Sequence, residues 1–113
     1  DEFAALASSL ANGADSLEEI AAWVLAHHRD NPQLPAAVAY NLLMAAGTVV
    51  AGWLLAKSAL AANSKLAEDQ AFYSTKIITA RFYAEQVMPR VSSFVKAAES
   101  GSEILMALDD DCF

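Results

Sequence analysis

The feature that most constrains the fold is a run of apolar residues spaced alternately by four and three positions. Eight residues follow this spacing: Tyr73, Ile77, Ala80, Ala84, Val87, Val91, Phe94 and Ala98. Such positions share one face of an α-helix. We therefore predict a long amphipathic helix from about Ala67 to Ala98. We expect it to kink or break at Pro89, because proline removes a backbone donor and clashes one turn back.

A second apolar seam with the same spacing begins at Phe3 and continues through Gly13. Its phase is unchanged on both sides of the glycine, so we expect one continuous helix over about residues 2–28. The alternative is a pair of helices, the second capped by Asp15 or Ser16.

The middle of the chain is its most apolar part, and we predict a helix there from about Pro35 to Asn63. No charged residue occurs from Leu34 to Ala56, which is long enough to cross a bilayer. More than a third of this span is alanine or glycine, Asn41 lies inside it, and its flanks have no Lys/Arg excess. We favour a central helix of a bundle, buried on all sides, over a membrane span.

Small residues in this middle helix form two notches where another helix can approach closely, Gly47 with Ala51 and Thr48 with Gly52. The notches suit either water or lipid. We expect Trp53 to anchor one side of the core.

Together these segments predict an all-α domain, because no strand-like alternation occurs. The expected architecture is an up-and-down bundle of three long helices with a kinked or short fourth element. We place the domain at residues 1–108 and expect residues 109–113 to be a disordered acidic tail. Gly101 is the expected C-terminal cap, and Ile104, Leu105 and Leu108 are expected to cover the end of the bundle.

Charge and cysteine usage exclude several classes of partner. The net charge is −7 and the basic residues are scattered, so neither nucleic acid nor an anionic membrane is an expected partner. Cys112 is the one cysteine of the 113 residues, which fits a reducing compartment, and we expect a cytoplasmic protein. The chain starts at Asp1 with no methionine and no leader pattern, which suggests a fragment of a longer protein or a processed product.

No arrangement of residues predicts catalysis, metal binding or cofactor binding by this chain. His27 and His28 are adjacent, so they point about 100° apart on a helix and cannot share one ion. Cys112 follows three aspartates in the expected acidic tail, and no nucleophile elbow or phosphate loop occurs. The aromatic side chains of Tyr73, Phe82 and Tyr83 could line a ligand groove, but we favour core or subunit contact.

A family resemblance rests on the spacing Tyr73-x-x-Lys76 followed by Ala80-Arg81-Phe82-Tyr83-x-Glu85-x-Val87-x-Pro89. Upstream, Tyr40-x-x-Leu43 is followed by Gly47 and Gly52, and downstream Gly101 precedes Ile104-Leu105. In this order, the residues resemble the C-terminal helical domain of long FAD-dependent acyl-CoA dehydrogenases. The first thirty residues match only as a generic amphipathic helix.

The resemblance implies that a parent enzyme oxidises an acyl-CoA to a 2-enoyl-CoA, with a glutamate base and FAD held by upstream domains of the same chain. It implies no catalytic residue and no bound cofactor in this fragment, which alone would be inactive. It assigns packing or interdomain contacts to a set of signature residues, and it implies a homo-oligomeric parent. That set is Tyr40, Gly47, Gly52, Tyr73, Lys76, Arg81, Phe82, Tyr83 and Pro89. Whether Lys76 or Arg81 also reaches a CoA phosphate or a neighbouring subunit stays open.

Two other hypotheses remain. The chain could be a stand-alone helical interaction module that dimerises through the seam from Tyr73 to Phe94, or through the Gly47 face. Less favoured is a small membrane protein that uses the span from Leu34 to Ala56.

Overall fold

The first helix of the computed structural model, α1 (Glu2–His27), is continuous. The structure describes residues 2–113, and α1 is followed by α2 (Leu34–Asn63), α3 (Gln70–Gln86), α4 (Arg90–Glu99) and a short 3-10 turn, η1 (Asp110–Cys112). This part of the chain contains no strand. The all-α prediction is confirmed, and so is the continuity of the first helix through Gly13.

The helix boundaries follow local chemistry. Pro35 lies in the first turn of α2, where its missing N–H costs nothing. α3 begins at Gln70, three residues later than predicted from Ala67, because the Asp69 carboxylate accepts a hydrogen bond from the Phe72 backbone N–H at 3.0 Å. The predicted break at Pro89 is confirmed, since α3 ends at Gln86 and α4 begins at Arg90.

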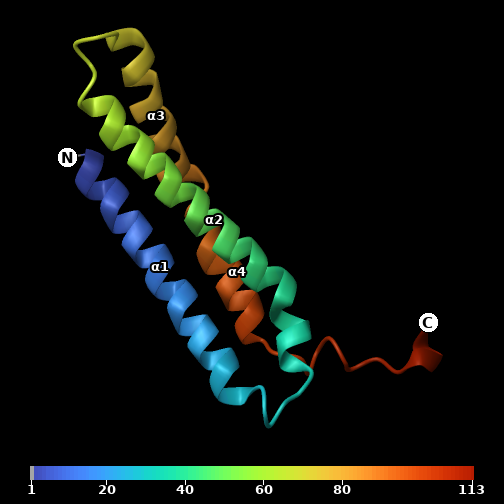
Figure 1. Cartoon of the computed structure of the whole chain (residues 1–113). Helices are drawn as coiled ribbons and strands as arrows, with labels where there is room; N and C mark the ends of the chain where they lie inside the picture. Colours follow the sequence, from blue (N-terminus) through green and yellow to red (C-terminus); the bar gives the residue numbers. More distant parts are fainter. Residues whose placement is uncertain (1) are drawn as a thin grey trace.

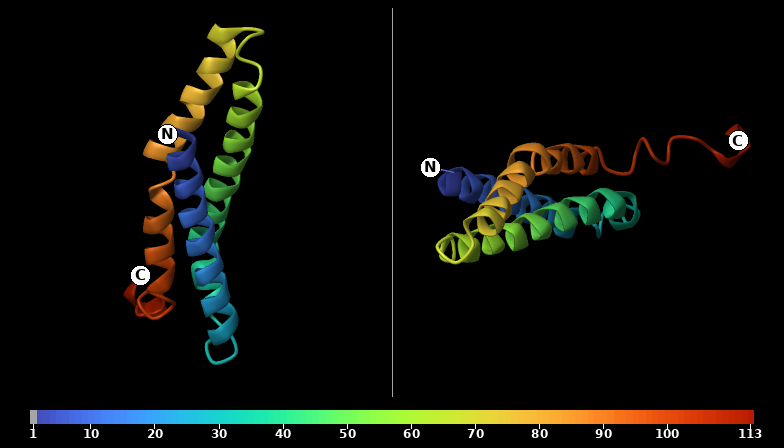
Figure 2. Two further views of the ribbon diagram at one scale, coloured as in Figure 1. Left: turned by 90° about the vertical axis from the view of Figure 1, so that its left-hand side faces the viewer. Right: turned by 90° about the horizontal axis from the view of Figure 1, so that it is seen from above.

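α2 is the hub of the bundle. It packs against α1, α3 and α4, and the α3–α4 pair forms one bent rod that runs back along it (Figure 1). In the view from above, α1 and the bent rod lie on one side of α2, and the opposite side of α2 has no neighbouring helix (Figure 2, right). The molecule is elongated, with extents of 64 × 30 × 17 Å.

The core consists of two separate clusters of buried side chains. The larger joins α1, α2 and α4 and is built on Ile20, Leu34 and Val38, all at most 2% exposed. The smaller joins α2 and α3 and contains Ala59, Ala62, Ile77 and Ala80. All eight residues of the predicted C-terminal seam are buried or partly buried, which confirms that seam.

α2 differs from the prediction of burial on all sides. Its length and composition would allow it to cross a membrane, and it is the one such helix among residues 2–113. It buries residues on one side, including Ala45, Val49 and Gly52, while Leu43 on the other side is 71% exposed. The prediction failed because one chain supplies neighbours for only part of the helix circumference.

The chain leaves the bundle after α4. Gly101 has a φ of +74°, the left-handed conformation expected of a C-terminal glycine cap. Ser102 is buried and its hydroxyl accepts a 2.7 Å hydrogen bond from the Asn31 amide, which ties this exit to the α1–α2 connection.

Beyond Ser102 the chain extends away from the helices, with η1 at its far end (Figure 1). Ile104, Leu105 and Leu108 are 62–70% exposed, so the expectation that they cover the end of the bundle was wrong. After Gly101 the backbone runs away from the helices and does not fold back over the end of the bundle.

Candidate functional site

The bend between α3 and α4 is organised around the Met88 side chain. Met88 is 5% exposed and enters a space that two glycines leave open, Gly13 on α1 and Gly52 on α2. A Cβ atom at Gly13 would lie 2.7 Å from Met88 Cε, and one at Gly52 would lie 2.7 Å from Met88 Sδ. These distances are shorter than van der Waals contact, so a side chain at either glycine would force the flexible Met88 side chain to shift.

A side chain–backbone hydrogen bond holds the same bend to α2. Tyr83, in the last turn of α3, donates its hydroxyl proton to the backbone carbonyl of Thr48 at 2.8 Å. Burial raises the pKa of Tyr83 above its ordinary value, so the phenol stays protonated and remains a donor. The predicted Thr48–Gly52 notch therefore receives Tyr83 and Met88 from the bent rod.

We expect Tyr83→Phe to lower the free energy of unfolding by about 0.5–1.5 kcal/mol, the usual net worth of one hydrogen bond. The folded-state pKa is raised, so the unfolded chain loses the phenolic proton first, near the ordinary tyrosine value of about 10. This contribution to stability is complete below that pH and declines above it. Urea titrations of both proteins across that range should show the difference between them shrinking as the pH rises. A difference that stays constant would contradict the assignment.

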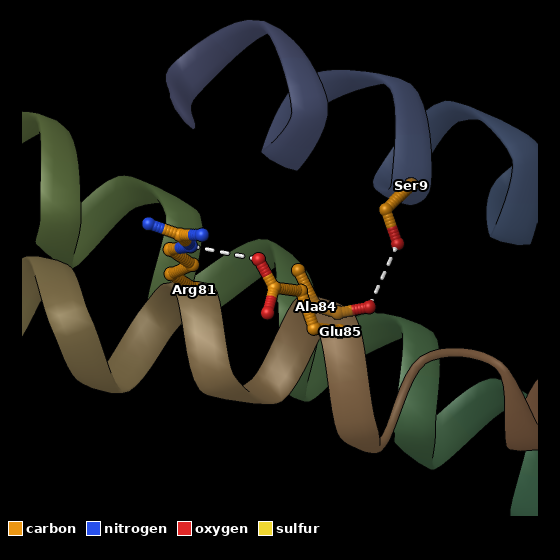
Figure 3. A network of polar contacts seen from close by, with 4 residues as sticks. All are labelled: Ser9, Arg81, Ala84 and Glu85. Atoms are coloured by element: carbon orange, nitrogen blue, oxygen red, sulfur yellow. Dashed lines mark hydrogen bonds and ion pairs between the residues drawn. The ribbon is translucent and has the colours of Figure 1, made fainter. Parts of the chain in front are cut away.

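Polar contacts between α1 and α3 form a second group beside the bend. Ser9 on α1 donates its hydroxyl proton to the backbone carbonyl of Ala84 at 3.3 Å, and Arg81 pairs with Glu85 at 2.7 Å (Figure 3). The ion pair joins residues four positions apart on α3, and the hydrogen bond and charge of Glu85 raise the pKa of Arg81. Both partners are more than half exposed, so the pair adds little stability.

A shallow hollow of about 390 Å³ lies between the same helices, lined in part by Leu6, Ser9 and Arg81. It opens broadly to solvent, and the guanidinium at its edge is already paired with Glu85. The hollow offers no enclosed surface for a ligand.

The signature residues do not converge on one site. Gly52, Tyr83 and Pro89 surround the bend, and Tyr73 packs against the smaller cluster. Lys76 is exposed with its ammonium 5.0 Å from the Phe72 ring, and Phe82 is 60% exposed. Of the three aromatics proposed to line a groove, Tyr73 and Tyr83 are packing residues whereas Phe82 faces solvent.

The remaining signature residues, Tyr40 and Gly47, lie on the open side of α2. We define the outer face of α2 as Tyr40, Leu43, Gly47, Val50 and Leu54, which follow one another at intervals of three and four residues. Its four side chains other than Gly47 are between 50% and 71% exposed, and a Cβ added at Gly47 would meet no atom within 4 Å. The sequence showed the apolar run but could not show which side of it lacked a neighbour.

Trp53 flanks this outer face and corrects another prediction. It is 49% exposed rather than anchored in the core, and the Lys57 ammonium lies 4.7 Å from its ring centroid. The aliphatic stem and charge of Lys57 thus cover part of an aromatic ring at the surface.

Titratable side chains are dispersed over the surface. His27, the last residue of α1, contacts the Trp23 backbone carbonyl through Nδ1 at 2.8 Å, a local contact at a helix C-terminus. Cys112 is exposed in η1. Among residues 2–113, no group of three or more His, Cys, Asp or Glu side chains is placed to hold a metal ion.

Comparison with known proteins connects these elements to a family. The family described as "Acetyl-CoA dehydrogenase C-terminal like" matches residues 1–109. This chain belongs to that family. The arrangement of four helices described above is therefore that of an acetyl-CoA dehydrogenase C-terminal-like domain.

Curated relatives of this acetyl-CoA dehydrogenase C-terminal-like domain are acyl-CoA dehydrogenases. A butyryl-CoA dehydrogenase of Syntrophomonas wolfei is 34% identical over 100% of this chain, which corresponds to 19% of the relative. The broad-specificity linear acyl-CoA dehydrogenase FadE5 of Mycobacterium tuberculosis is 30% identical over 65% of the chain and 13% of its own length.

A third relative is the 3-methylmercaptopropionyl-CoA dehydrogenase of Ruegeria pomeroyi, 34% identical over 74% of the chain and 15% of the relative. The chain thus spans less than one fifth of the length of the relatives it matches. No solved structure matches it significantly.

Proposed function

We propose that this chain is the C-terminal structural domain of an FAD-dependent acyl-CoA dehydrogenase and aids assembly of that enzyme. The observation that carries the proposal is the family match over residues 1–109, together with the alignment of the whole chain to a butyryl-CoA dehydrogenase. In this proposal the parent oxidises acyl-CoA to 2-enoyl-CoA in domains outside this chain. FAD and the catalytic base belong to those domains, and the parent is a cytoplasmic homo-oligomer.

The packing within the chain supports a structural role. Two residues of the signature set, Tyr83 and Gly52, take part in holding the bend against α2, through the Tyr83–Thr48 hydrogen bond and the contact of Gly52 with Met88. The Arg81 guanidinium pairs with Glu85, which lowers its value as a partner for a CoA phosphate. These contacts position helices relative to one another.

The stand-alone dimerisation module receives less support. Its proposed contact surface, the seam from Tyr73 to Phe94, is used within the chain, since Ile77, Ala80 and Val91 are buried against other helices. Apolar exposure is found instead on the outer face of α2, the other surface considered for association.

The test is to isolate the native polypeptide that contains this sequence with an antibody raised against it. We expect a polypeptide about five times as long as this chain, because the alignment covers 19% of the butyryl-CoA dehydrogenase. We also expect a flavin absorption band that bleaches on addition of butyryl-CoA or a longer acyl-CoA. A colourless native protein no larger than 113 residues would refute the proposal.

A further inference from the structure

We propose that the outer face of α2 is the surface on which the preceding dehydrogenase domains dock, with a partner helix crossing at Gly47. This inference rests on the proposed function, because it assumes that those domains belong to the same polypeptide.

The first argument is the apolar character of this face. Tyr40, Leu43, Val50 and Leu54 are 67%, 71%, 50% and 51% exposed, and no charged residue occurs between Leu34 and Ala56. A solvent-facing helix surface normally carries charged and polar side chains. The neighbouring Met44 and Trp53 extend the same surface and are 38% and 49% exposed.

The size of this surface suits a stable contact. A fully exposed aromatic side chain presents on the order of 150–250 Å² of surface. The outer face has one aromatic and three aliphatic side chains, each at least half exposed, along about four helical turns. Together with Met44 and Trp53 they present several hundred Å² of apolar surface. Interfaces between domains of one chain bury about 600–1,500 Å² in total, shared between two sides. The outer face of α2 therefore provides one side of such an interface.

The second argument is the position of Gly47. Glycine inside a helix costs roughly 1 kcal/mol relative to alanine, and the other three glycines have a reason within the chain. Gly13 and Gly52 admit Met88, and Gly101 has a φ of +74°. Gly47 faces open space, so nothing within the chain requires a glycine there.

A helix that packs on the outer face supplies that reason. Gly47 lies in the middle of the face, with Leu43 one turn before it and Val50 almost one turn after it. The absence of a side chain between these two walls lets a second backbone approach closely. Ala51, four residues after Gly47, has a small side chain and so does not block the notch on the same side of the helix.

The third argument concerns which partner fills the notch. About four fifths of a relative such as the butyryl-CoA dehydrogenase lies outside the region that aligns with this chain, so a large surface is available in the same polypeptide. A second copy of the chain is disfavoured by charge, because each copy has a net charge of −7 and the two would repel each other. An uncharged face suits a permanent apolar contact.

The experiment compares Gly47→Leu with Ala22→Leu, a matched change at an exposed position of α1. Both are made in the 113-residue chain and in the long native polypeptide. In the short chain, we expect Gly47→Leu to leave Tm unchanged or to raise it, because leucine is the better helix former and meets no atom. In the long polypeptide the same leucine should obstruct the crossing, so that limited proteolysis releases this domain roughly tenfold faster. Ala22→Leu should leave the release rate unchanged.

The outcomes separate the two proposals. A native polypeptide no longer than this chain and without flavin would overturn the proposed function and the docking inference together. A long, flavin-containing polypeptide in which both variants release the domain at the wild-type rate would overturn the docking inference alone. The short chain could instead sediment as a discrete dimer, with Gly47→Leu converting it to a monomer. That result would assign the outer face of α2 to a second copy of the chain and would overturn the docking inference.

Discussion

Replacing Met88 by alanine should lower the free energy of unfolding by about 2–5 kcal/mol, the usual range for truncation of a buried methionine. The effect should lie near the upper end, because Met88 fills a space bordered by two glycines. Gly13 and Gly52 have no side chains that could move into the vacated volume, so the cavity would persist. Small domains are stable by only about 5–15 kcal/mol, and the loss would be a large part of that total.

Urea denaturation followed by far-UV circular dichroism measures this change, with Met106→Ala as the matched control. Met106 is 56% exposed in the segment that leaves the bundle, so its truncation should alter stability by less than about 0.5 kcal/mol. Equal effects of the two substitutions would show that Met88 does not fill the gap between α1 and α2.

Introducing leucine at Gly52 should destabilise the fold by about 1–3 kcal/mol, the usual cost of overpacking. The new Cβ would lie 2.7 Å from Met88 Sδ and 3.4 Å from Tyr83 Cε1, so the side chain could enter only if Met88 left its buried position or the bend moved away from α2. Gly47→Leu is the comparison, because it makes the same change in the same helix and gains the same helix propensity. In the short chain it should be neutral or slightly stabilising.

The double variant Gly52→Leu with Met88→Ala tests the shared space directly. Leucine would occupy part of the volume that methionine vacates, so the pair should be less destabilising than the sum of the single changes. Strict additivity, or a Gly52→Leu protein as stable as Gly47→Leu, would refute the contact between Met88 and Gly52.

Periodicity predicted the parts of this fold that depend on one helix at a time. The seams through Gly13 and through Ile77 are packed where expected, and Pro89 separates α3 from α4. Gly101 ends α4 in the conformation that a C-terminal cap requires. Each of these predictions rests on a local rule about backbone or spacing.

The predictions that failed depended on which surfaces have a neighbour. Trp53 was expected in the core because its helix is apolar throughout, yet the other helices pack against the opposite side of α2. Leu105 was expected to cover the bundle, but the chain after α4 extends away from the helices and leaves this side chain 62% exposed. An apolar sequence indicates that a surface favours burial, without specifying what covers it.

The contacts around the bend could not be predicted for a different reason. Tyr83 and Thr48 are 35 positions apart, and Gly13 meets Met88 from an even greater separation. The sequence signal at Gly52 was interpreted, with Thr48, as a notch for another helix, and Gly13 was interpreted only as a position in the seam of the first helix. The structure shows that two of the four glycines serve one methionine side chain.

The unequal size of the two core clusters means that the molecule does not open uniformly. At the end where α2 meets α3, Ile77 is the one large side chain among the four buried residues. The other three are Ala59, Ala62 and Ala80, small side chains that remove little apolar area from water. The other end buries Ile20, Leu34 and Val38 in a cluster that three helices share. Thermal fluctuations should therefore separate the α2–α3 end at a lower free energy than global unfolding requires, while the α1–α2–α4 end remains closed. The α1–α2–α4 end is therefore the more stable end of the domain, and the α2–α3 end opens more readily.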